Sequence, residues 1–124
     1  MQGYEAKIVD TSKELSAKEK IQMKDTTDAI RLDEATAHEA VIINPANYAV
    51  IAVHNEQSES KDYEVYVVID KDGTKYVTGS EAFYSAFRGI WDEMDGEDDD
   101  WGIKVYRMPS KNFAGRDFIT CSII

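Results

Sequence analysis

Hydrophobic and polar residues alternate along the middle of the chain in a way that predicts a β-hairpin. Residues 63–70 form an unbroken run rich in β-branched and aromatic residues, which is typical of a strand. The Asp72-Gly73 pair supplies the turn, and residues 75–78 return as a second strand. Alternation along the first strand places one set of side chains in the core (Tyr63, Val65, Val67, Ile69) and the other outside (Glu64, Tyr66, Val68).

After this hairpin the period changes from two to that of a helix. Five large apolar residues lie at a spacing that forms one stripe over residues 81–94: Phe83, Phe87, Ile90, Trp91 and Met94. Ser80 stands at the N-cap position of this helix, and Gly96 follows its last turn. The pattern predicts an amphipathic helix with one buried face.

Two more strands are predicted after the helix, at residues 101–108 and 117–124. In the first strand, Ile103 and Val105 face one way and Lys104, Tyr106 and Met108 the other. In the second strand the two sets are Ile119, Cys121 and Ile123, and Phe118, Thr120 and Ser122.

The first half of the chain has weaker patterns. It predicts strands at residues 4–10, 28–33 and 41–43, a short helix at 17–24, and a loop at 34–39. Ser16 and Glu19 form a capping-box pattern at the start of that helix. Residues 45–54 are ambiguous, because Asn44-Pro45 suits a helix start whereas Val50, Ile51 and Val53 favour a strand; we expect a helix there.

Composition is that of a globular protein: the chain has 124 residues, of which 43% are hydrophobic and 10% aromatic. We expect a single domain over residues 1–124, with a core in 41–124 and with 1–40 as an extension or as first strands. There is one cysteine, and neither a signal peptide nor an apolar run of about 18 residues is found, so we expect a cytoplasmic protein with no membrane partner.

Charge is distributed unevenly along the sequence. The net charge is −10, and residues 92–100 hold seven carboxylates. Residues 102–124 instead hold four basic residues and one acid, and the basic residues alternate with aromatic ones. Cations for phosphates together with flat rings for bases are what binding of single-stranded nucleic acid requires.

The strand order predicts a mostly β fold with one main helix. It resembles the five-stranded OB barrel, in which a helix lies between the third and fourth strands. A small α+β sandwich is the rival architecture. If the strands are neighbours, one groove collects the candidate nucleic-acid-binding residues, which are Tyr66, Lys104, Tyr106, Arg107, Lys111, Phe113, Arg116 and Phe118.

Three stretches, residues 70–80, 101–107 and 110–118, resemble small single-stranded DNA-binding proteins of bacteriophages that infect Gram-positive bacteria. The resemblance extends over residues 63–124. It implies an OB fold, single-stranded DNA as the ligand, a role in protecting it during phage replication or recombination, and phage or host replication proteins as partners. Bacterial relatives of that family carry their acids on a C-terminal tail, whereas this chain has them at 92–100.

A second hypothesis uses the acidic segment itself. Residues 92–100 would imitate the charge of DNA and bind a host protein, which would make the chain an inhibitory protein. The spacing of the acids does not fit an EF-hand, and no catalytic or zinc motif is present. We therefore expect neither an enzyme nor a cofactor or metal site, and a homodimer stays open.

Overall fold

The computed structural model describes residues 4–57, 62–94, 101–109 and 117–124. Contacts group the chain into two compact units, and each unit is built from separate stretches of sequence. The first unit contains residues 1–30 and 46–79, and the second contains residues 31–45 and 80–124. The expected single domain stays a prediction.

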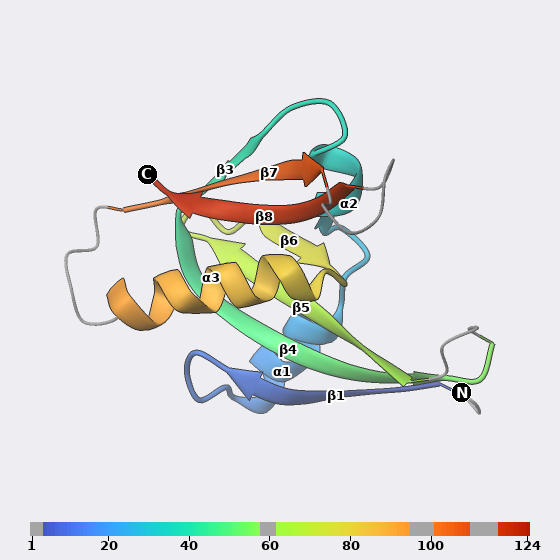
Figure 1. Cartoon of the computed structure of the whole chain (residues 1–124). Helices are drawn as coiled ribbons and strands as arrows, with labels where there is room; N and C mark the ends of the chain where they lie inside the picture. Colours follow the sequence, from blue (N-terminus) through green and yellow to red (C-terminus); the bar gives the residue numbers. More distant parts are fainter. Residues whose placement is uncertain (1–3, 58–61, 95–100, 110–116) are drawn as a thin grey trace. The chain divides into compact units, whose positions relative to one another are not determined.

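The first unit is built on a five-stranded sheet (Figure 1). Its strands are β1 (Tyr4–Thr11), β4 (Pro45–Asn55), β5 (Asp62–Asp70), β6 (Lys75–Thr78) and β2 (Ile30–Arg31), in that spatial order. β1 pairs antiparallel with β4, with a bulge between Ile8 and Asp10, and β5 pairs antiparallel with β6. The predicted strands at 4–10, 63–70 and 75–78 are confirmed, and the one at 28–33 shrinks to two residues.

The helix that we expected at residues 45–54 is wrong, because this segment is strand β4. It pairs with β1 from Ala49 opposite Thr11 to Asn55 opposite Tyr4. Side chains on both faces of β4 are buried, among them Tyr48, Ala49, Val50 and Ile51. Because the segment pairs with β1 and is buried on both faces, the strand preference of its β-branched residues outweighs the helix-start signal of Asn44-Pro45.

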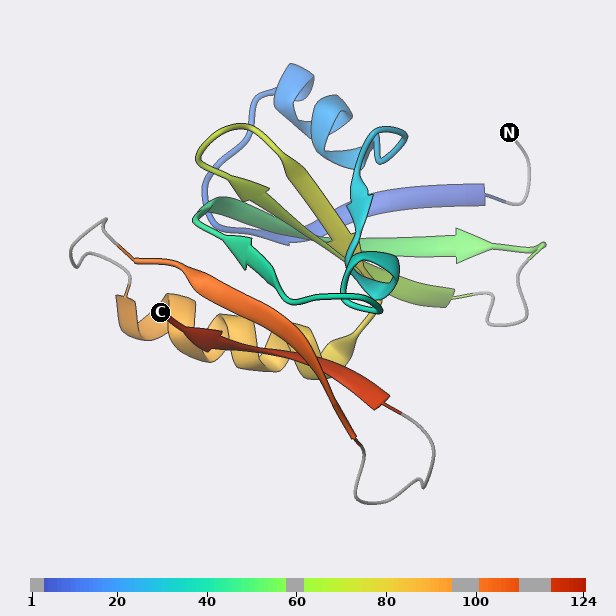
Figure 2. The ribbon, with the colours of Figure 1, turned by 90° about the horizontal axis from the view of Figure 1, so that it is seen from above.

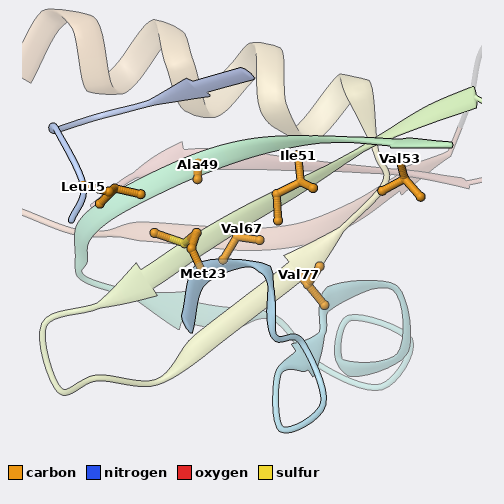
Figure 3. Packing of buried hydrophobic residues seen from close by; sticks show 7 residues of the cluster. All are labelled: Leu15, Met23, Ala49, Ile51, Val53, Val67 and Val77. Atoms are coloured by element: carbon orange, nitrogen blue, oxygen red, sulfur yellow. The ribbon is translucent and has the colours of Figure 1, made fainter. Parts of the chain in front are cut away.

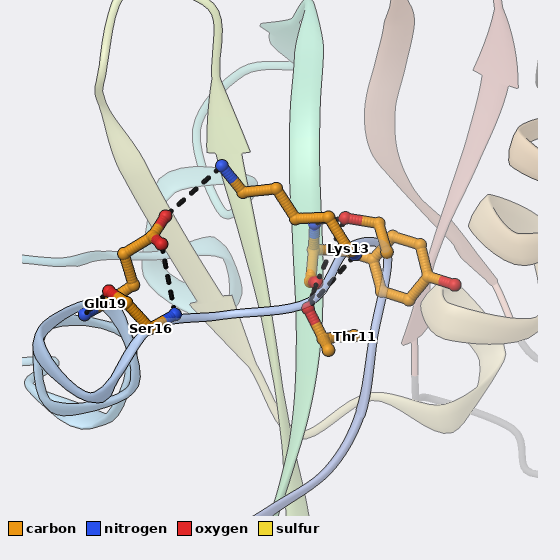
Figure 4. Close-up of polar contacts among 6 residues, drawn as sticks. Thr11, Lys13, Ser16 and Glu19 are labelled. Atoms are coloured by element: carbon orange, nitrogen blue, oxygen red, sulfur yellow. Dashed lines mark hydrogen bonds and ion pairs between the residues drawn. The ribbon is translucent and has the colours of Figure 1, made fainter.

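Helix α1 (Ala17–Lys24) begins at the predicted capping box. The Ser16 side chain accepts from the Glu19 amide and the Glu19 carboxylate accepts from the Ser16 amide, at 3.2 and 3.1 Å (Figure 4). Lys13 adds an ion pair to Glu19 at 3.3 Å. Met23 is the buried residue of this helix, and it packs with Leu15, Ala49, Ile51, Val53, Val67 and Val77 in the core of the first unit (Figure 3).

The β5–β6 hairpin has the predicted turn but not the predicted faces. Gly73 adopts a positive φ of 92°, which explains why glycine stands there. Tyr66 and Val68, which we expected on the outside, are buried, with Tyr66 only 4% exposed. Alternation fails as a guide here because both faces of β5 are buried.

The second unit is built on a three-stranded antiparallel sheet of β3 (Val41–Ile43), β7 (Ile103–Pro109) and β8 (Asp117–Ile123), in the order β3-β7-β8 (Figure 2). Helix α3 (Glu81–Met94) packs against β8. Phe83 and Phe87 are fully buried, and their rings stack at 5.8 Å between centroids. The apolar stripe predicted for residues 81–94 is thereby confirmed at these two positions.

Residues 34–39, expected as a loop, start within a single helical turn, α2 (Leu32–Ala35). The fold is mostly β, as predicted. Its described strands lie in a five-stranded and a three-stranded sheet, so the structure does not confirm a closed five-stranded barrel. Among the residues that the structure describes, no helix is long and apolar enough to cross a membrane.

Candidate nucleic-acid interface

The three-stranded sheet of the second unit brings several predicted site residues onto one face. Pairing places Ile42 opposite Lys104 and Lys104 opposite Ser122, then Tyr106 opposite Thr120 and Met108 opposite Phe118. Directly opposed residues of neighbouring strands point to the same side of a sheet. We call this face the platform; it consists of Ile42, Lys104, Tyr106, Met108, Phe118, Thr120 and Ser122.

The platform is exposed, whereas the middle of the other face is buried and its ends, at Arg107 and Ile123, are exposed. Ile42, Met108 and Phe118 are 50%, 42% and 37% exposed, which is high for residues of this size. On the other face lie Ile43, Ile103, Val105, Ile119 and Cys121, all buried. The alternation predicted for 101–108 and 117–124 is therefore confirmed, and α3 packs against β8 of this sheet (Figure 1).

Tyr106 and Phe118 are diagonal neighbours on the platform. Tyr106 lies opposite Thr120, and Phe118 lies two residues from Thr120 on β8. Diagonal neighbours across an antiparallel pair are about 7–8 Å apart. The Tyr106 hydroxyl is 2.7 Å from the Ser122 Oγ. Two aromatic residues therefore stand on one open face of the sheet, and the hydroxyl of one of them, Tyr106, is hydrogen-bonded toward Ser122, on the diagonal away from Phe118.

Lys104 supplies the positive charge of the platform. It is exposed, and its neighbours across the sheet, Ile42 and Ser122, are uncharged. Aromatic rings and an ammonium group on the same face can stack unpaired bases and hold a phosphate. The sequence predicted Lys104, Tyr106 and Phe118 as site residues but not Ile42. For Ile42 the sequence showed only that it belongs to the β-branched run at 41–43.

Arg107 points to the opposite side and has other partners. Its guanidinium donates to the backbone oxygen of Asp33 and to the Thr36 Oγ1, the latter at 3.3 Å. Thr36 in turn donates to the Leu32 carbonyl at 2.7 Å. The structure thus gives Arg107 a place in holding α2 against β7, away from the platform.

The other predicted site residues are not brought to the platform. Tyr66 is buried in the sheet of the first unit, so its expected position beside Lys104 on an outer face is wrong. Lys111, Phe113 and Arg116 lie outside the described residues, as does most of the acidic segment. At the start of that segment, Asp92 pairs with Arg88 at 3.3 Å.

Cys121 is not a candidate nucleophile. It lies on the buried face of the three-stranded sheet, and burial raises the pKa of its thiol to about 12. A thiol with so high a pKa carries almost no thiolate at neutral pH, and the thiolate is the reactive form.

His54 forms the clearest polar cluster of the first unit. Its Nδ1 lies 2.7 Å from Asp62 and its Nε2 lies 2.6 Å from Glu56. Hydrogen bonds to Asp62 first, and then to Glu56, raise the pKa of His54 above its usual value. Within the described ranges, no group of three His, Cys, Asp or Glu residues is placed to hold a metal ion.

Two adjoining pockets lie in the first unit, beside the end of α1 and the β5–β6 turn. Their volumes are about 390 and 220 Å³, and both are lined by Gly73 and Lys75. The Lys75 ammonium donates to the backbone oxygens of Gln22 and Asp25. These carbonyls belong to the last turn and C-cap of α1, so Lys75 stabilises the helix end there.

Comparison of the chain with protein-family models, with curated proteins and with solved structures gives no match. The case for a function therefore rests on the geometry of the chain itself.

Proposed function

We propose that this protein binds single-stranded DNA with little sequence preference, on the platform of the β3-β7-β8 sheet. One observation carries the proposal: Lys104, Tyr106 and Phe118, predicted from sequence as binding residues, lie on the same exposed face. Base stacking on aromatic rings is tolerant of sequence because every base has a flat face.

The chemistry of the platform favours an unpaired strand over a duplex. Bases in a duplex are stacked on each other and offer only their edges to a protein, whereas an unpaired base offers its face. Only one of the platform residues is a cation, so the rings supply most of the contact. Lys111, Phe113 and Arg116, which lie outside the described residues, stay predicted binding residues, with two further cations and one ring.

The proposed role is protection of single strands during phage replication or recombination, as the resemblance of residues 63–124 implies. This role does not depend on a closed five-stranded barrel, because an open sheet face can stack bases as well. The alternative, in which residues 92–100 imitate DNA and bind a host protein, stays a prediction, since residues 95–100 lie outside the described ranges.

Fluorescence anisotropy of a labelled oligo-dT strand tests the proposal, with a duplex of the same length as the control. We expect binding to the single strand and little to the duplex. Replacing Phe118 by Ala removes one stacking ring, which costs about 1–3 kcal/mol, or about 5- to 150-fold in affinity.

Tyr63→Ala is the matched control, because Tyr63 is an aromatic residue of β5 with the same 37% exposure as Phe118. It should leave affinity unchanged. Absence of binding at low salt, where electrostatic attraction is strongest, would show that the platform has another use. An equal loss in Tyr63→Ala and Phe118→Ala would place the site elsewhere.

A further inference from the structure

The hydrogen bond between Tyr106 and Ser122 determines how the Tyr106 ring lies. Side chains leave a strand roughly perpendicular to the sheet. The serine hydroxyl is carried on a single carbon, so the Ser122 Oγ stays close to the backbone of β8. For the Tyr106 hydroxyl to come within 2.7 Å of it, the ring must lean over from β7 onto β8.

The direction of this lean follows from the register. Ser122 is opposite Lys104, and Tyr106 is opposite Thr120, so the bond runs diagonally across the two strands. A tyrosine spans this diagonal only if the long axis of its side chain, from Cβ to the hydroxyl, leans over β8 and does not stand upright on the sheet. This lean agrees with the half-buried state of Tyr106.

We propose that Ser122 is a positioning residue, which holds the Tyr106 ring in one orientation, leaning over β8, before it stacks on an unpaired base. The stacking itself rests on the proposed function; the positioning does not. A ring without this hydrogen bond would have to be fixed when a base arrives, and fixing a side chain costs binding free energy. Because Ser122 already fixes the ring in the free protein, this cost does not reduce the binding free energy.

Phe118 provides the contrast. It has no hydroxyl that could form a hydrogen bond, and it is 37% exposed. It lies on the other diagonal from Tyr106, two residues from Thr120 in the direction away from Ser122. The two rings of the platform should therefore differ: the Tyr106 ring is fixed before binding, and the Phe118 ring is free to adjust to the second base.

The first test is made without nucleic acid. Three-bond couplings that report χ1 should show one rotamer for Tyr106 in the wild type and an average over rotamers in Ser122→Ala. Thr120→Val is the matched control, because it removes a neighbouring platform hydroxyl of β8 and should leave the Tyr106 rotamer unchanged. A fixed rotamer in Ser122→Ala would overturn the positioning role.

The second test is a double-mutant cycle in oligo-dT binding. Ser122→Ala and Tyr106→Phe each remove the same hydrogen bond and keep the ring, so each should weaken binding by about two- to tenfold. The double variant should be no weaker than either single one. Independent, additive losses would overturn the proposal. If the wild-type protein fails to bind, the proposed function falls, while the rotamer test still decides the role of Ser122.

Discussion

At the scale of single residues, the hydrogen bonds of His54 constrain the protonation of its imidazole ring. Carboxylates only accept hydrogen bonds, so the contacts to Asp62 and Glu56 each need an N–H on the imidazole ring. Both nitrogens carry a proton only in the imidazolium form. When the ring is protonated, the cluster links the end of β4 to the start of β5 through a charged histidine.

The pH dependence of stability follows from this bond pattern. The pKa of His54 is raised in the folded protein above the ordinary 6.5, so its contribution is full below pH 6.5 and is lost as pH rises through the raised pKa. We expect the difference in unfolding free energy between wild type and His54→Gln to shrink over that window. Urea denaturation at a series of pH values measures it.

The matched control for His54 is His38→Gln, since His38 is exposed. Its difference from wild type should not follow the same trend. A His54→Gln difference that stays constant with pH, or that grows as pH rises, would contradict the imidazolium link.

At the scale of elements, the short helix α2 depends on a residue from a distant strand. A single helical turn has almost no stability of its own. Arg107 of β7 donates to the Asp33 carbonyl and to Thr36, and Thr36 bonds back to Leu32. One side chain of β7 thus bonds to two oxygens of α2 and its C-cap.

Replacing Arg107 by Met should lower the unfolding free energy by about 1 kcal/mol, because charge-assisted bonds are lost at a partly solvated site. Affinity for oligo-dT should stay close to that of the wild type. Lys104→Met is the matched comparison on the same strand, and it should show the reverse: near-normal stability in urea and weaker binding. A binding loss in Arg107→Met equal to that of Lys104→Met would restore Arg107 to the interface.

At the scale of the whole molecule, charge limits how the protein can bind DNA. A net charge of −10 works against any nonspecific coating of a polyanion. The cations that we predict for the site are Lys104 and, outside the described residues, Lys111 and Arg116. The proposed binding would then use few cations on a molecule of net negative charge.

Three cations predict that the affinity for single-stranded DNA depends only weakly on salt concentration. Each phosphate contact on a single strand contributes about −0.7 to the slope of log affinity against log salt, so three cations give about −2. Replacing Lys111 and Arg116 together by Ala should reduce the slope to about −0.7 and lower affinity. Lys7→Ala, on an exposed position of β1, is the control that should change neither. A slope that is unchanged in the double variant would remove residues 111 and 116 from the site.

The sequence by itself determined the elements whose signals are local. The Asp72-Gly73 turn, the capping box of Ser16 and the buried Phe83 and Phe87 of the α3 stripe depend on neighbours along the chain, and they appear as predicted. The alternation of β7 and β8 also held, because one face of that sheet is buried and the other is exposed.

Only the tertiary structure decided the features that depend on remote segments. Residues 45–55 became a strand because β1 pairs with them, and Tyr66 is buried because both faces of β5 are covered. Arg107 found its partners in α2, more than seventy positions earlier in the chain. A local pattern shows which residues are apolar or charged. Which strand faces are buried, and which side chains are hydrogen-bonded to each other, depends on segments that are remote in sequence and meet only in the folded chain.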